Sequence, residues 1–73
     1  MITSNLCRAA RHLLGWRQEV LAERAEVSVT SIRRFETSKT SPHRATLKAL
    51  QQALEDAGIE FIDDDGIGLK LKR

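Results

Sequence analysis

The segment 17–36 carries apolar residues at helical spacing on either side of one polar turn. The apolar positions that form the predicted inward faces, in chain order, are Leu21, Ala22, Ala25, Val27, Ile32 and Phe35. Spacings of three and four residues place side chains on one face of a helix, and Ser28 is a residue type that caps a helix N-terminus. The pattern predicts two short helices, one beginning at Gln18 and one spanning about 29–37, joined by a tight turn.

Two flanking segments show the same periodicity. A first helix, capped by Thr3 or Ser4, runs to about Leu14 and stops at Gly15, while a fourth begins near His43 and stops at Gly58. The buried stripes predicted for these two helices are Leu6, Ala10, Leu13 and Leu14, then Leu47, Leu50, Ala53 and Leu54. We interpret Cys7 as a small apolar residue in or beside the first stripe, and Trp16 as a core residue between the first two helices.

The last fifteen residues change to a strand pattern. Residues 59–62 have strand composition, 63–66 form an acidic turn, and 67–73 alternate apolar and polar side chains. An isolated hairpin is marginal in water, so its apolar stripe needs cover. We favour cover by a second copy of the chain through strand addition, and the alternative is a hairpin folded on its own core. The residues assigned to dimerisation are Ile59, Phe61, Ile67, Leu69 and Leu71.

The predicted fold class is therefore mainly α. We expect a compact helical bundle of four to five helices with a helix-turn-helix, plus a short C-terminal β-hairpin or dimerising strand. At 73 residues the chain forms one small unit, which buries only about 60% of its unfolded surface and gains from dimerisation. One cysteine excludes an internal disulfide, and no apolar run approaches the roughly 20 residues of a membrane span. The first residues show no signal peptide. We expect a cytoplasmic protein without membrane contact.

Charge is distributed unevenly along the sequence. Residues 1–54 contain nine Lys/Arg and four Glu, a net charge of +5, whereas residues 55–73 contain three Lys/Arg and six Asp/Glu, a net charge of −3. The basic portion includes the two central helices, and a basic surface favours a polyanionic partner.

One face of segment 29–37 has chemistry suited to a nucleic-acid groove. Opposite Ile32 and Phe35 it carries short side chains first and cations later, namely Val29, Thr30, Arg33 and Arg34. Arginine makes bidentate contacts with guanine, and small apolar groups contact the thymine methyl. We therefore expect a target with at least one guanine and one thymine in each half-site. The alternative for Arg33 is a phosphate or solvent contact.

At these residues the chain resembles the Cro/phage-repressor (XRE) family of helix-turn-helix DNA-binding proteins. The family pattern falls on Gln18, Ala22, Glu26 and Ile32, and the resemblance extends from about Leu6 to Leu54. It implies a sequence-specific transcriptional regulator that binds double-stranded DNA as a homodimer, with 1–58 as the DNA-binding domain and 59–73 as a dimerising tail. The chain departs from the family where Glu26 and Ser38 replace glycine, and where Arg17 replaces a capping residue.

The resemblance also implies roles for individual residues. Base edges are contacted by Val29, Thr30 and Arg34, with Arg33 as their neighbour. Gln18 contacts a phosphate and braces the recognition helix, and Arg11 pairs with Glu36. The full set of phosphate-contacting residues is Arg17, Gln18, Ser28, Ser31, Lys39, Thr40, Ser41 and Arg44.

Other functions remain as alternatives. The chain could be the antitoxin of a toxin–antitoxin pair, with the tail on the toxin, or a protein-interaction adaptor or antiactivator that uses the same fold. We expect no enzymatic activity, because no nucleophile–base set or carboxylate pair has workable spacing. We also expect no cofactor and no metal site, since Cys7, His12 and His43 are single groups.

Overall fold

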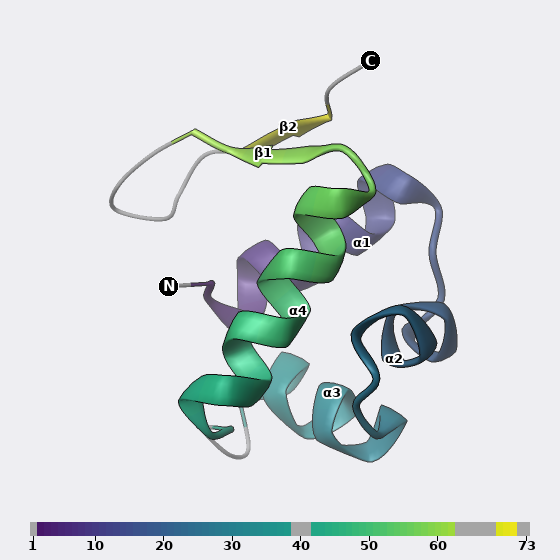
Figure 1. The fold of residues 1–73 in the computed structure, drawn as a ribbon, viewed down its shortest axis with the longest axis vertical. Coiled ribbons are helices and arrows are strands. Elements are labelled where there is room, and N and C mark those ends of the chain that lie inside the picture. Colours follow the sequence, from purple (N-terminus) through teal and green to yellow (C-terminus); the bar gives the residue numbers. More distant parts are fainter. Residues whose placement is uncertain (1, 39–41, 63–68, 72–73) are drawn as a thin grey trace.

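Four helices surround one apolar core, and two short strands lie across one end of it (Figure 1). These are the elements of the described residues, 2–38, 42–62 and 69–71 of the computed structural model. The elements are α1 (Ser4–Leu14), α2 (Gln18–Ala25), α3 (Val29–Glu36), α4 (Arg44–Asp56), β1 (Ile59–Phe61) and β2 (Leu69–Leu71). The observed architecture confirms the predicted mainly α bundle with a short C-terminal β element.

The helix boundaries follow from capping chemistry. The Thr3 hydroxyl accepts the Leu6 N–H at 3.2 Å, and Ser28 accepts the Ser31 N–H at 3.1 Å, so α1 and α3 begin with a side-chain cap. Gly15 ends α1 in the left-handed region at φ 71°, where glycine has no steric penalty. Arg17 makes no side-chain cap at the start of α2, as its residue type implies.

The core contains residues from every helix and from β1. Its buried apolar members are Ile2, Leu6, Cys7, Ala10, Leu21, Ala22, Ala25, Ile32, Phe35, Leu50, Ala53, Leu54 and Ile59. The prediction that Leu13 is buried was wrong, because its side chain is 48% exposed. Cys7 and Arg11 are buried instead, so the inward face of α1 is rotated toward them and Leu13 lies at its edge.

The C-terminal strands pair with each other within one chain. They are antiparallel, with Ile59 opposite Leu71 and Phe61 opposite Leu69. Ile59 is 2% exposed, and Phe61 and Leu71 pack partly buried against the same core. The Ile59 side chain therefore contributes to the chain's own core and offers almost no surface to a partner. The predicted turn 63–66 and Ile67 lie outside the described residues.

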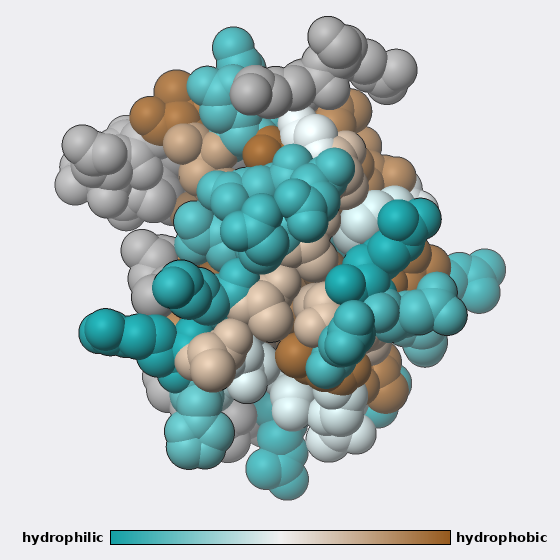
Figure 2. All heavy atoms as spheres, viewed as in Figure 1, coloured by the Kyte–Doolittle hydropathy of each residue, from teal (hydrophilic) through white to brown (hydrophobic). Residues whose placement is uncertain are grey.

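Figure 2 shows hydrophilic side chains gathered over the C-terminal part of α4, which lies in front in this view, with weakly hydrophobic surface beside them. Among the described residues the large hydrophobic side chains that remain exposed are Leu13 and Ile62. None of the described helices has the length and apolar character required to traverse a lipid bilayer.

Candidate nucleic-acid interface

Helices α2 and α3 are joined by a tight turn at Glu26. This residue has φ 58° and ψ 43°, and its N–H bonds the carbonyl oxygens of Ala22 and Glu23. Left-handed geometry costs a residue with a Cβ about 1–2 kcal/mol. The chain tolerates that strain here because Val27 continues the turn, donating its N–H to Ala22 at 3.0 Å and packing on the core. The two short helices predicted from the apolar pattern are thus held as one helix-turn-helix unit.

Helix α3 has one buried and one exposed face. Ile32, Phe35 and Glu36 are buried, and they fix the orientation of the helix. Thr30, Arg33 and Arg34, assigned to base reading from the sequence, are exposed. Val29, assigned with them, is half-buried and packs against the core, so it offers less free surface than the other three.

The described residues assigned to phosphate contact lie at the starts of α2, α3 and α4. Arg17, Ser28 and Arg44 are exposed, while Gln18 and Ser31 are half-buried. The Ser28 hydroxyl is fully used in the cap, because it accepts the Ser31 N–H and donates to the Ser31 Oγ at 2.9 Å. The hydrogen of the Ser31 hydroxyl remains available for another partner. The predicted contacts Lys39, Thr40 and Ser41 lie outside the described residues.

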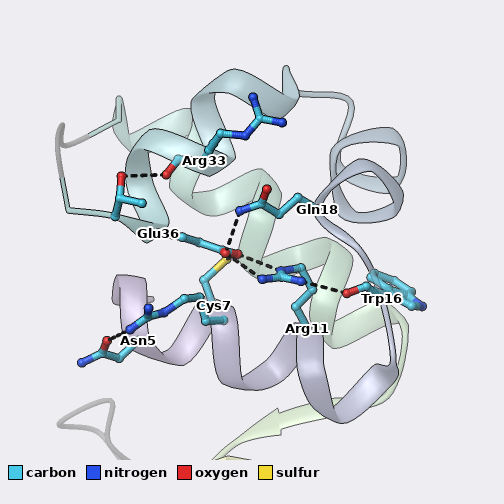
Figure 3. A network of polar contacts seen from close by, with 9 residues as sticks. Asn5, Cys7, Arg11, Trp16, Gln18, Arg33 and Glu36 are labelled. Atoms are coloured by element: carbon cyan, nitrogen blue, oxygen red, sulfur yellow. Dashed lines mark hydrogen bonds and ion pairs between the residues drawn. The ribbon is translucent and has the colours of Figure 1, made fainter.

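A buried carboxylate, that of Glu36, joins α3 to α1 and α2 (Figure 3). Its Oε1 accepts the Arg11 Nη2–H at 2.8 Å and the Gln18 amide N–H at 3.1 Å. Its Oε2 accepts the Arg11 Nε–H at 3.0 Å and the Cys7 thiol at 3.4 Å. Glu36 is 3% exposed and Arg11 9% exposed, so this is a desolvated, bidentate ion pair with two additional donors.

Arg11 also secures the connection from α1 to α2. Its Nη1 donates to the Trp16 carbonyl oxygen at 2.9 Å. The Trp16 ring is half-buried against the core, and Arg24 lies over it at 5.4 Å from the ring centroid. Arg11 therefore positions α3 and the loop that leads into α2 at the same time.

The electrostatics of the network favour its charged form. Burial by itself raises the pKa of Glu36, but the hydrogen bonds from Arg11 and Gln18 and the Arg11 charge outweigh it, so the pKa lies below the ordinary value of 4.5. The hydrogen bond to Glu36 raises the pKa of Arg11. Both groups therefore stay ionised at neutral pH.

The Cys7 thiol is expected to resist chemical modification in the folded protein. Cys7 is 0% exposed, and burial, followed by the Glu36 charge, raises the pKa of its thiol to about 12. Since the thiolate is the reactive species, we expect a disulfide reagent at about pH 8 to label native protein at least ~100-fold more slowly than denatured protein. Equal labelling rates in the two states would contradict this placement.

The sequence pattern alone did not reveal how many donors gather on Glu36. The pairing of Arg11 with Glu36 and the bracing role of Gln18 came from the family resemblance. The Cys7 thiol and the Trp16 carbonyl had no sequence signal, because neither residue type is diagnostic of a polar contact. Within the described residues no three His, Cys, Asp or Glu side chains lie close enough to hold a metal ion.

The fold and this arrangement of helices are those of helix-turn-helix proteins. The sequence profile of the helix-turn-helix family matches residues 8–57, which is more than half of the chain, and the chain belongs to that family. This confirms the predicted resemblance. No curated protein matches the chain.

Among solved structures, the chain is similar to the DNA-binding domain of the P22 c2 repressor (residues 1–76). That structure was determined by nuclear magnetic resonance in solution and compared with the DNA-binding domain of the 434 repressor. The sequences are 34% identical, the TM-score is 0.67, and the match covers 75% of this chain and 72% of that one.

Proposed function

We propose that this protein is a transcriptional regulator that binds double-stranded DNA sequence-specifically, with α3 in the major groove. The observation that carries the proposal is the division of α3 into two faces. Glu36, Ile32 and Phe35 anchor the helix in the protein, while the side chains of Thr30, Arg33 and Arg34 are exposed. A helix held rigidly with donors on its outer face is the arrangement by which helix-turn-helix proteins read base edges.

Membership of the helix-turn-helix family and similarity to a repressor's DNA-binding domain support this proposal. The Arg34 guanidinium is suited to guanine, and the Thr30 methyl group is suited to the thymine methyl. Arg17, Gln18 and Arg44 lie on other elements and are suited to phosphates, which set orientation and most of the affinity. A regulator of this kind acts by occupying its site and needs no catalytic group.

A homodimer is the second part of the proposal. One short recognition helix reads few base pairs, and two copies related by a two-fold axis read half-sites about one helical turn, roughly 34 Å, apart. The described tail pairs within its own chain, so a dimer through the tail would use its strand edges and the 56% exposed Ile62. The alternatives, an antitoxin or a protein-binding adaptor, instead assign the tail to a different protein.

The test is a selection of binding sites from a random duplex library, followed by fluorescence anisotropy on the selected duplex and a scrambled one. We expect tighter binding to the selected duplex, with two half-sites of inverted symmetry. For about six phosphate contacts, affinity should fall roughly 10³-fold between about 50 and 200 mM salt.

A folded protein that binds neither duplex at the lowest salt would refute the proposal. That outcome would favour the protein-binding alternatives. Sedimentation with and without DNA would measure the oligomeric state in the same samples, and a single copy bound at one half-site would contradict the homodimer.

A further inference from the structure

Arg33 and Arg34 are neighbours in sequence but point in different directions. Successive residues of an α-helix are about 100° apart around its axis. Arg34 follows Thr30 by four residues, which places both on one outward stripe, opposite the buried Ile32. Arg33 precedes Glu36 by three residues and therefore shares the flank of α3 that bears Glu36.

The Glu36 flank faces the start of α2. The Gln18 amide donates to Glu36 Oε1 at 3.1 Å, so the first turn of α2 lies against this side of α3. A helical side chain leans toward the N-terminal end of its own helix. Arg33 consequently extends one turn away from Glu36 on the exposed surface of the flank that faces α2, and Figure 3 shows its guanidinium directed away from the carboxylate.

Arg33 forms no ion pair within the described residues. Glu36, the nearest carboxylate along the same flank, already accepts hydrogen bonds from Arg11, Gln18 and Cys7. In the described part of the chain, Arg11 with Glu36 is the one ion pair within 4.0 Å. Gln18 gives one amide hydrogen to Glu36, and its second amide hydrogen stays free to donate.

We propose that Arg33 and Gln18 bind one DNA phosphate together, and that Arg33 adds affinity without reading sequence while Arg34 reads a base. This inference rests on the proposed function. With α3 in the major groove, its outward stripe faces the base edges, and its flank toward α2 faces the sugar–phosphate backbone. Arg33 on the flank and Gln18 on the adjacent turn present a cation and an amide donor to that backbone from two helices.

The two arginines should therefore differ in what they change. We expect Arg33→Ala to weaken binding by the same factor on the selected and the scrambled duplex, and to lower the slope of log affinity against log salt by about 0.9. Arg33→Lys should restore the slope. Arg34→Ala should weaken the selected duplex about 5- to 150-fold and broaden the sequences recovered by selection at one base pair.

A shared phosphate makes Gln18 and Arg33 non-additive. In the double variant Gln18→Ala/Arg33→Ala the fold-loss in affinity should be smaller than the product of the two single fold-losses, while its salt slope should equal that of Arg33→Ala, because the neutral Gln18 amide releases no counterion. Lys48→Ala removes the same charge from the exposed surface of α4, at a residue with no assigned DNA or dimer contact, and serves as the control. Thermal melting of each variant separates loss of fold from loss of contact.

Three outcomes would overturn the assignment. One is that Arg33→Ala weakens the selected duplex alone with an unchanged salt slope, because Arg33 would then read a base. A second is that Arg33→Ala has no effect on either duplex. A third is a fold-loss in affinity for Gln18→Ala/Arg33→Ala equal to the product of the two single fold-losses, because the two side chains would then bind independently. Failure of the wild-type protein to bind any duplex is a different result and refutes the proposed function itself.

Discussion

Replacing Arg11 with alanine should remove most of the protein's stability at room temperature. The substitution removes both charge-assisted bonds to Glu36 and the bond to the Trp16 carbonyl. It leaves a carboxylate that is 3% exposed with only Gln18 and Cys7 as donors. Removing one partner of a buried pair costs about 3–5 kcal/mol, and a small domain has about 5 kcal/mol of stability to lose.

Urea unfolding followed by circular dichroism and Trp16 fluorescence measures this loss. Arg8→Ala is the matched control, because Arg8 lies on the same helix and is exposed, and its side chain bonds only Asn5 at 2.6 Å among the described contacts. The control should change the free energy of unfolding by no more than about 0.5 kcal/mol. A loss below about 1 kcal/mol in Arg11→Ala would contradict a structural role for the pair.

The same pair gives stability a defined dependence on pH. The pKa of Glu36 in the folded protein lies below its ordinary value of 4.5, so the unfolded chain takes up this proton first as acid is added. The contribution is fully present above about pH 4.5 and is lost as pH falls through the lower folded-state pKa. Arg11→Ala should show a shallower loss of stability with acid in that window, since it lacks the donors that lower the pKa of Glu36.

The double variant Arg33→Ala/Arg34→Ala should lose two to three orders of magnitude, ~3–4 kcal/mol, in affinity for the selected duplex. If Arg34 contacts a base and Arg33 a phosphate, as proposed, the first loss lowers sequence preference and the second lowers affinity for any duplex. Both side chains are exposed, and the variant should keep its fold, with a free energy of unfolding within about 0.5 kcal/mol of the wild type.

The matched control for this variant is Arg24→Ala/Lys48→Ala, which removes the same net charge. Arg24 lies over Trp16 at the far end of α2, and Lys48 is exposed on α4. Equal losses from the two double variants would mean that net charge, and not the face of α3, governs binding. Unchanged affinity in Arg33→Ala/Arg34→Ala would exclude α3 as the reading element.

Much of the fold was predictable because local signals and the apolar pattern agree. Ser28 caps α3 and Gly15 ends α1 as their residue types imply. The prediction of burial was wrong at Leu13. Periodicity is read from apolar residues alone, so it does not predict that α1 turns a charged side chain, Arg11, toward a buried partner. That rotation is decided by a contact 25 residues away in the chain.

The tail and the site were predictable only in part. Alternation of apolar residues identified strands, but it is the same for a strand that pairs within its chain and one that pairs with another copy. In the structure β1 and β2 pair with each other, with Ile59 buried and opposite Leu71. For the site, residue type identified the cations of α3, whereas their division between stripe and flank required the position of Gln18.

The Glu36 carboxylate makes the helix-turn-helix cooperative with α1. Its donors come from positions 7, 11 and 18, so partial assembly leaves a desolvated charge without enough partners and is disfavoured. Segment 17–36 therefore cannot act as an autonomous reading unit, because excision removes Cys7 and Arg11. The recognition helix is presented in its docked orientation only when the whole α1–α3 assembly is complete, and opening of α1 releases it as one cooperative unit.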